Sequence, residues 1–398
     1  MTSPYFFVII KDKENFLRSQ KEATMITTTQ RDTQRPIKGS REALLRKVLR
    51  ELAIIGGVGI ASALIFFILH RLSVDLLIPI GIVLMATLAY YNGANDVSKV
   101  IATLVGSGVT QYRPAIVYGS LCTLAGAGVS TALATGLVAT FTKGLIAGST
   151  HLTLYFALAA ILGALAWVYF ATRLALPVST THAITGAVVT TGMFAFGTNA
   201  VLWTNLLTKI MLPLLFSPVI AFVVGLVLFW SIRLLMPQVN LDWMHWLSSG
   251  FASFTRGLND APKIVALGAT FFLINGKLDK TPLWLFLVVA LAMGLGSVLG
   301  GMKVTQTLAE RVTKMNHKEG FSANLATAIL VGLSSPLSLP VSTTHVSSCA
   351  IIGIGMHKGT KNIQWRTVWE MVLAWIVTLP AAGIFGGLAY ILLSFSTW

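Results

Sequence analysis

The sequence has few charged residues and almost no cysteine. Charged residues make up only 11% of its 398 residues, whereas hydrophobic residues make up 55%. A soluble globular protein carries roughly 25% charged residues. The deficit excludes an ordinary soluble domain and predicts a chain that lies largely in a lipid bilayer. The only cysteines, Cys122 and Cys349, lie in apolar surroundings, so neither a disulfide framework nor a cysteine metal site is expected.

Acidic residues are especially scarce. The chain has 14 Asp and Glu against 29 Lys and Arg, and 11 of those basic residues fall within residues 1–50. No DNA- or RNA-binding motif accompanies the excess, so nucleic acid is not an expected partner. Basic residues concentrate in cytoplasmic segments of membrane proteins. We therefore expect the N-terminal tail to be cytoplasmic and the chain to lie in a cell membrane, the bacterial inner membrane in the first place.

Motifs of enzymes and nucleotide-driven pumps are also missing. The sequence contains no His-Glu-x-x-His, no Gly-x-Ser-x-Gly and no Gly-x-x-x-x-Gly-Lys-Ser/Thr, which are signatures of a zinc hydrolase, a serine hydrolase and a phosphate-binding loop. We expect no enzyme activity and no cofactor.

Long apolar runs organise what is present. About 18 to 20 apolar residues cross a hydrocarbon core roughly 30 Å thick. The runs predict an all-α polytopic membrane protein with about 10 to 12 crossings and re-entrant segments. The expected division is a basic cytoplasmic tail at 1–50, an extra transmembrane helix and loop at 51–74, and two repeats at 75–235 and 236–398.

Two polar motifs recur within these halves in the same order. Leu176–His182 and Leu339–His345 both read Leu-Pro-Val-Ser-Thr-Thr-His. Upstream of each lies a second matched pair, Gly-Ala-Asn-Asp-Val-Ser-Lys at 93–99 and Gly-Leu-Asn-Asp-Ala-Pro-Lys at 257–263. The two offsets differ by one residue, which identifies an internal repeat.

The Pro-Val-Ser-Thr-Thr-His segments predict helix starts inside the membrane. Pro favours a first helical turn, and Ser or Thr favours the cap. Such a half-helix directs free N–H groups and hydroxyls at an anion. An alternative is a pair of Pro-kinked helices whose hydroxyls bond back to their own carbonyls. The closing histidines are either structural or contribute a proton or a hydrogen bond. The candidate anion ligands and the histidines are Ser179, Thr180, Thr181, Ser342, Thr343, Thr344, His182 and His345.

The Asn-Asp motifs predict a place for a cation. Asp96 and Asp260 adjoin long apolar runs, and a carboxylate at membrane depth is usually paired, hydrated or bound to a cation. An alternative is that they cap helices at the membrane edge. Lys99 and Lys263 lie one turn further on. They either neutralise the carboxylates or present positive charge to an anionic substrate.

These four motifs resemble the signatures of the PiT inorganic phosphate transporters, over about residues 75–398. The resemblance implies two inverted repeats with broken helices, phosphate held near the midplane, symport with Na⁺ or H⁺, and a homodimer in the bilayer. It places phosphate and cation ligands at Asn95, Asp96, Asn259 and Asp260 and at the six hydroxyl residues. Many members have Asn where Lys99 stands, so an ammonium could here replace one bound cation.

Other functions stay open from the sequence. Sulfate or another tetrahedral oxyanion fits the same hydroxyls and helix ends. A channel or an intramembrane hydrolase is a more distant alternative.

Overall fold

The computed structural model describes residues 74–237, 239–274 and 281–394, which form helices and no β-strand. The expected tail at 1–50, nearly all of the expected extra helix at 51–74 and the polar loop at 275–280 lie outside these residues. The helices are α3 (Val74–Asp96), α4 (Ser98–Gly106), α5 (Tyr112–Leu133), α6 (Thr135–Thr142), α7 (Leu154–Arg173), α8 (Thr180–Phe196), α9 (Trp203–Asn205), α10 (Leu212–Leu235), α11 (Asp242–Ile274), α12 (Leu283–Gly300), α13 (Met302–Glu310), α14 (His317–Ser334), α15 (Thr343–Gly355) and α16 (Trp365–Ser394).

Seven segments of the described part are long and apolar enough to cross a membrane. The prediction of an all-α polytopic membrane protein is thereby confirmed. Helices α8 and α15, with 17 and 13 residues, are shorter and begin inside the helical bundle. The seven segments are Leu76–Gly106, Tyr112–Leu133, Leu154–Arg173, Trp203–Leu235, Asp242–Ile274, Leu283–Gly300 and Trp365–Ser394.

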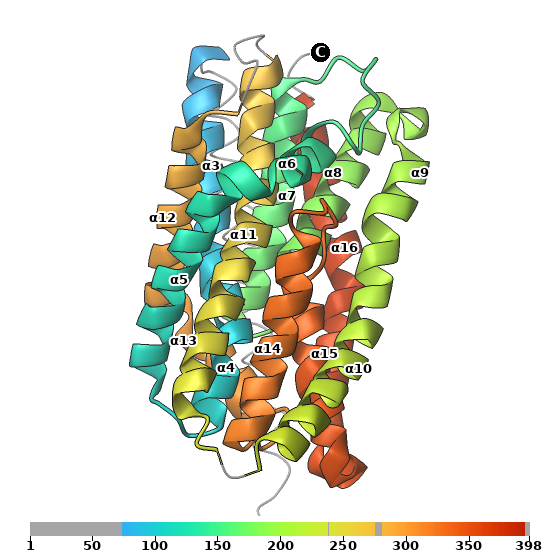
Figure 1. The fold of residues 1–398 in the computed structure, drawn as a ribbon. Helices are drawn as coiled ribbons and strands as arrows, with labels where there is room; N and C mark the ends of the chain where they lie inside the picture. Colours follow the sequence, from blue (N-terminus) through green and yellow to red (C-terminus); the bar gives the residue numbers. More distant parts are fainter. Residues whose placement is uncertain (1–73, 238, 275–280, 395–398) are drawn as a thin grey trace, which may run out of the picture. The chain divides into compact units, whose positions relative to one another are not determined.

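Equivalent helices of the two halves pack in matching pairs. α3 packs on α12 as α11 packs on α5, and α10 packs on α15 as α16 packs on α8. In Figure 1, α3 runs downward and α11 upward, and α8 ends toward the upper end while α15 ends toward the lower end. Opposite directions of equivalent helices are what inverted repeats predict.

A glycine holds each Asn-Asp motif against a helix of the other half. A Cβ at Gly93 of α3 would lie 2.0 Å from the carbonyl oxygen of Met293 in α12. A Cβ at Gly257 of α11 would lie 2.2 Å from the carbonyl oxygen of Thr123 in α5. Both distances are far inside van der Waals contact, so only glycine permits this approach. The two motif helices are therefore positioned by equivalent close contacts.

Both half-helices begin where the duplicated heptapeptide predicts. Ser179 caps α8, and its Oγ accepts a hydrogen bond from the backbone N–H of His182 at 3.3 Å. Ser342 caps α15, and its Oγ accepts from the N–H of His345 at 3.2 Å. The preceding residues are not helical, and Ala175 and Ser338, at equivalent positions, both have positive φ, 57° and 59°. The alternative of continuous, proline-kinked helices is wrong.

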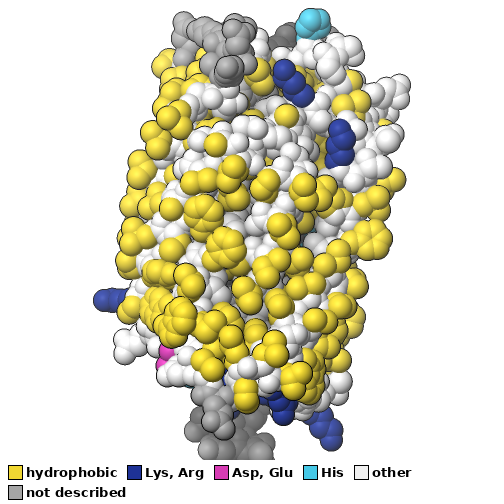
Figure 2. All heavy atoms as spheres, in the orientation of Figure 1, with side chains coloured by type: hydrophobic (Ala, Val, Ile, Leu, Met, Phe, Trp, Pro, Cys, Tyr) yellow, Lys and Arg dark blue, Asp and Glu magenta, His cyan; other side chains and the backbone are white. Residues whose placement is uncertain are grey.

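The outer surface is apolar. Large hydrophobic side chains recur every three or four residues along the outer faces of α10, α12 and α16, as a helix against lipid requires. Figure 2 shows hydrophobic side chains over the middle of the visible face, with Lys and Arg toward its ends. Those on α10 and α12 include Leu215, Val219, Val223, Val227, Trp230, Leu287, Leu291, Leu295 and Leu299.

Candidate functional site

Two asparagines fasten the extended segments that precede the half-helices. The Asn95 side-chain amide donates to the carbonyl of Leu176 at 2.9 Å, and its oxygen accepts from the N–H of Val178 at 3.1 Å. In the other half, the Asn259 amide donates to the carbonyl of Val341 at 3.1 Å. Both side chains are fully buried. The asparagines thus hold the chain just before each half-helix in place.

Each aspartate is paired with the lysine one turn further along. Lys99 donates to Asp96 and, at 2.6 Å, to the carbonyl of Val178. Lys263 donates to Asp260 at 3.3 Å and to the carbonyl of Val341 at 3.1 Å. Of the two roles left open for the lysines, this structure shows the neutralising pair in both halves. In this structure the ammonium groups are held by oxygen atoms of the protein.

The interpretation of the aspartates as helix caps is wrong. Asp260 lies in the middle of the 33-residue helix α11. Asp96 is the last residue of α3, and α4 begins after Val97 without a side-chain cap. Only 2% of Asp96 and 3% of Asp260 are exposed. Both carboxylates are therefore deep in the helical bundle, where a carboxylate is stable only with partners.

Threonines of each half-helix reach the other half. The Thr344 hydroxyl of α15 donates to the carbonyl of Val178 at 2.7 Å, and the Thr181 hydroxyl of α8 donates to that of Val341 at 3.4 Å. Thr181 Oγ1 also accepts from Lys263 at 2.7 Å. The carbonyls of Val178 and Val341 thus each accept a hydrogen bond from a half-helix of the other half.

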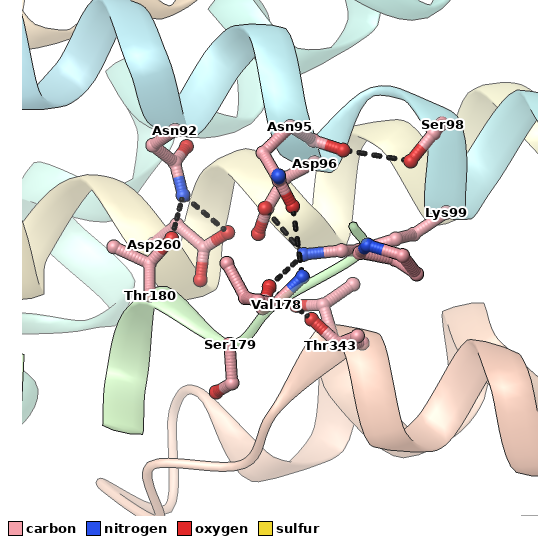
Figure 3. A network of polar contacts seen from close by, with 12 residues as sticks. Asn92, Asn95, Asp96, Ser98, Lys99, Val178, Ser179, Thr180, Asp260 and Thr343 are labelled. Carbon is pink, nitrogen blue, oxygen red and sulfur yellow. Dashed lines mark hydrogen bonds and ion pairs between the residues drawn. The ribbon is translucent and has the colours of Figure 1, made fainter. Parts of the chain in front are cut away.

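The remaining hydroxyls take different places. Thr180 and Thr343 accept from nearby asparagine amides, at 3.0 Å from Asn92 and 3.5 Å from Asn259. In Figure 3 the Ser179 side chain points away from the carboxylates, in keeping with its cap bond. The structure therefore brings four threonines into the network, whereas the two serines serve the backbone of their own helices.

The duplicated histidines lie together, beside the network. The rings of His182 and His345 are 4.7 Å apart between centroids, and His345 lies 4.4 Å from the ring of Trp375. The contacts with rings fit a structural role, and no hydrogen bond joins either imidazole to the carboxylates or lysines described above.

Sequence reasoning missed two residues of the network. The Asn92 amide donates to Thr180 Oγ1 and, at 3.3 Å, to Asp260 Oδ2 (Figure 3). Arg256 is fully buried in α11, one turn before Asp260. Asn92 and Arg256 stand at equivalent positions, each three residues before the motif asparagine. Their equivalent positions in the repeat could have drawn attention to them. Because the two residue types differ, a search for identical residues did not find them.

The fold and the network together define a class. Multi-pass membrane helices enclose two sets of carboxylate, ammonium, amide and hydroxyl groups, and two half-helices begin beside them. Polar groups of this kind at helix breaks in equivalent halves are typical of a transporter's central site. The chain is thus a membrane protein with the architecture of a transporter for small charged solutes.

Comparison with known proteins identifies the family. The Phosphate transporter family matches residues 92–241 and 236–386. A probable low-affinity inorganic phosphate transporter of Bacillus subtilis is 32% identical over 338 residues, covering 80% of this chain and 98% of that protein. One of Mycobacterium leprae is 30% identical over 322 residues, covering 78% and 77%. The chain belongs to the phosphate transporter family, which confirms the expected resemblance and the prediction of a transporter rather than an enzyme.

A solved structure shares the fold. It is described as the sodium-dependent phosphate transporter, and it superposes with a TM-score of 0.74 at 23% sequence identity. The match covers 80% of this chain and 99% of that chain. At this identity the comparison supports the arrangement of helices, and the ions that this protein uses have to be argued from its own residues.

Proposed function

We propose that this protein carries inorganic phosphate across a cell membrane by symport with protons. Family membership supports the substrate. The observation that favours protons over Na⁺ is the position of the two lysine ammonium groups. At equivalent places in the two halves, each ammonium contacts a carboxylate and a backbone carbonyl.

A bound Na⁺ would be coordinated by the same kinds of group, carboxylate and backbone carbonyl oxygens. Unwound backbone carbonyls and helix ends coordinate Na⁺ in transporters with broken helices. Lys99 and Lys263 place a tethered positive charge there instead, with the Thr181 hydroxyl as a further oxygen for Lys263. A tethered ammonium cannot cross with the substrate. The mobile positive charge is then a proton, for which Asp96 and Asp260 are the proposed acceptors.

Phosphate would bind at the starts of the half-helices. Helix N-termini present N–H groups and a positive dipole end to an anion. Thr180, Thr181, Thr343 and Thr344 line this region with hydroxyls, together with the amides of Asn95 and Asn259. Ser179 and Ser342 support the site by capping its helices. In this conformation the threonines and asparagines are buried and hydrogen-bonded within the protein, so binding requires the half-helices to separate.

The orientation and assembly are also proposals. The basic residues within 1–50 support a cytoplasmic N-terminal tail. The homodimer stays a prediction from the family resemblance.

The test is uptake of labelled phosphate by proteoliposomes under an inward proton gradient, an inward Na⁺ gradient, or neither. We expect uptake with the proton gradient in Na⁺-free buffer. Arsenate should compete, because it carries a proton as phosphate does, whereas fully ionised sulfate should compete weakly. Absence of phosphate uptake under every gradient would refute the proposal. Uptake of sulfate in preference to phosphate would favour the oxyanion alternative.

A further inference from the structure

Arg256 is a fully buried cation that the proposed coupling scheme does not use. It lies in α11, and none of its three guanidinium nitrogens has a hydrogen-bond partner among the described residues. A buried charged group without partners is strongly unfavourable in protein or lipid. Five N–H donors in a planar fork suit a tetrahedral oxyanion particularly well. The side chain therefore suits a ligand of that chemistry.

The charges around Arg256 do not balance among the described residues. Its electrostatic neighbours are Asp96 and Asp260, and each of these carboxylates already has its own ion pair, with Lys99 and with Lys263. The buried cluster thus contains two anions and three cations. The surplus positive charge lies on the one member whose donors are unused within the described part of the chain.

The equivalent position of the first half carries no charge. Asn92 stands there, and its amide bonds to Thr180 and Asp260. A neutral amide thus fills the corresponding place and joins the network. In the second half the larger, charged side chain makes no hydrogen bond to the described residues. A purely structural side chain at this depth would be expected to have partners.

We propose that the guanidinium of Arg256 binds the transported phosphate directly. This inference rests on the proposed function and deepens it. The anion site then has one fixed positive charge, contributed by the second half, in addition to the hydroxyls and helix ends of both halves. Because Arg256 lies one helical turn before Asp260 in α11 and interacts electrostatically with Asp96 and Asp260, phosphate and the coupling groups share one electrostatic environment.

Binding of labelled phosphate to purified protein tests the proposal independently of transport. Arg256→Gln keeps a hydrogen-bond donor and removes the charge, whereas Arg256→Lys keeps the charge and removes the planar fork. Hydrogen bonds to charged groups predict a dissociation constant at least about tenfold higher for Arg256→Gln. We expect a smaller increase for Arg256→Lys. Arg366→Gln removes an exposed guanidinium, paired only with Glu370 in the described residues, and should bind as wild type does.

The thermal response separates ligand binding from a structural role. Phosphate should raise the melting temperature of the wild type and of Arg366→Gln, and this rise should be reduced or lost in Arg256→Gln. If Arg256→Gln does not fold, the same comparison applies to Arg256→Lys. A variant with lower melting temperature but unchanged phosphate affinity would overturn the inference and make Arg256 a counter-charge. In that case, phosphate uptake by the wild-type protein would still support the proposed function. If the wild-type protein took up no phosphate, the proposed function itself would be refuted.

Discussion

The two Asn-Asp-x-x-Lys segments have the same letters and different structures. In the first half α3 ends at Asp96 and α4 begins at Ser98, with Val97 between them in helical conformation, and Lys99 pairs with Asp96. In the second half α11 continues through the motif for 33 residues, and Asp260 contacts Lys263, Asn259 and Asn92. The first half contributes neutral Asn92 where the second contributes Arg256. The duplicated motif thus contains a buried Asp–Lys pair in each half, but a buried arginine accompanies it only in the second half.

The largest expected effect comes from removing the carboxylates. Asp96→Asn and Asp260→Asn should both abolish proton-coupled phosphate uptake, because each leaves a buried ammonium without its counter-ion. Breaking a buried ion pair in this way lowers stability by about 3–5 kcal/mol. Asp260→Asn should have the lower melting temperature, because this carboxylate also bonds Asn92 and Asn259. Uptake in proteoliposomes and thermal unfolding measure the two effects. Wild-type uptake in either variant would exclude that aspartate from coupling.

Replacing the lysines should change the coupling ion. Lys99→Asn and Lys263→Asn each free a carboxylate and a carbonyl for a mobile cation, so phosphate uptake should become stimulated by Na⁺. The gain should be larger for Lys263→Asn, where the Thr181 hydroxyl adds a further oxygen. Lys303→Asn, at an exposed position of α13, is the matched control. If phosphate uptake by both variants depends on Na⁺ as it does in the wild type, the lysines serve only to neutralise the carboxylates.

The hydrogen bonds that Thr181 and Thr344 make to the opposite half should contribute unequally to stability. Thr181→Val removes an acceptor of the Lys263 ammonium, whereas Thr344→Val removes only a hydroxyl bond to a carbonyl. Typical losses are about 1.5–3 kcal/mol for a bond to a charged group and about 0.5–1.5 kcal/mol for a neutral one. The melting temperature should therefore fall further for Thr181→Val. The reverse order would show that the contact of Thr344 with Val178 is the stronger link.

Loss of a helix-capping serine should have the smallest effect on the melting temperature, and this effect should be the same in both halves. Ser179→Ala and Ser342→Ala each remove one cap bond, of 3.3 Å and 3.2 Å, and loss of a cap costs about 1 kcal/mol. Similar small decreases in melting temperature are expected, with phosphate affinity changed little. A large loss of phosphate affinity in either variant would show that this serine binds phosphate directly.

Local sequence predicted those parts of the site that depend on neighbouring residues. The cap bonds of Ser179 and Ser342 and the pairing of Asp96 with Lys99 follow from spacing within one helical turn. The boundary between α3 and α4 at Val97 could not be predicted from local spacing. Pro262 favours interruption of α11, yet α11 is continuous, whereas the equivalent segment without proline is divided at Val97 into α3 and α4. There the Ser98 hydroxyl donates to the carbonyl of Asn95 at 2.7 Å, a bond that competes with the helical ladder.

Contacts between the halves could not be predicted from the repeat. The bond from Thr344 to the carbonyl of Val178 depends on how two half-helices approach, which no local pattern specifies. Arg256 was missed for a related reason. The repeat drew attention to identical letters, whereas the informative feature was a difference at equivalent positions, Asn92 against Arg256.

Simultaneous uptake of labelled phosphate and labelled sodium by wild-type proteoliposomes tests the central claim most directly. An inward proton gradient is imposed with Na⁺ present on both sides, and protein-free vesicles measure the leak. We predict that phosphate accumulates while sodium entry stays at the leak level, because Lys99 and Lys263 occupy the cation places. Sodium entering in fixed proportion to phosphate would contradict the account.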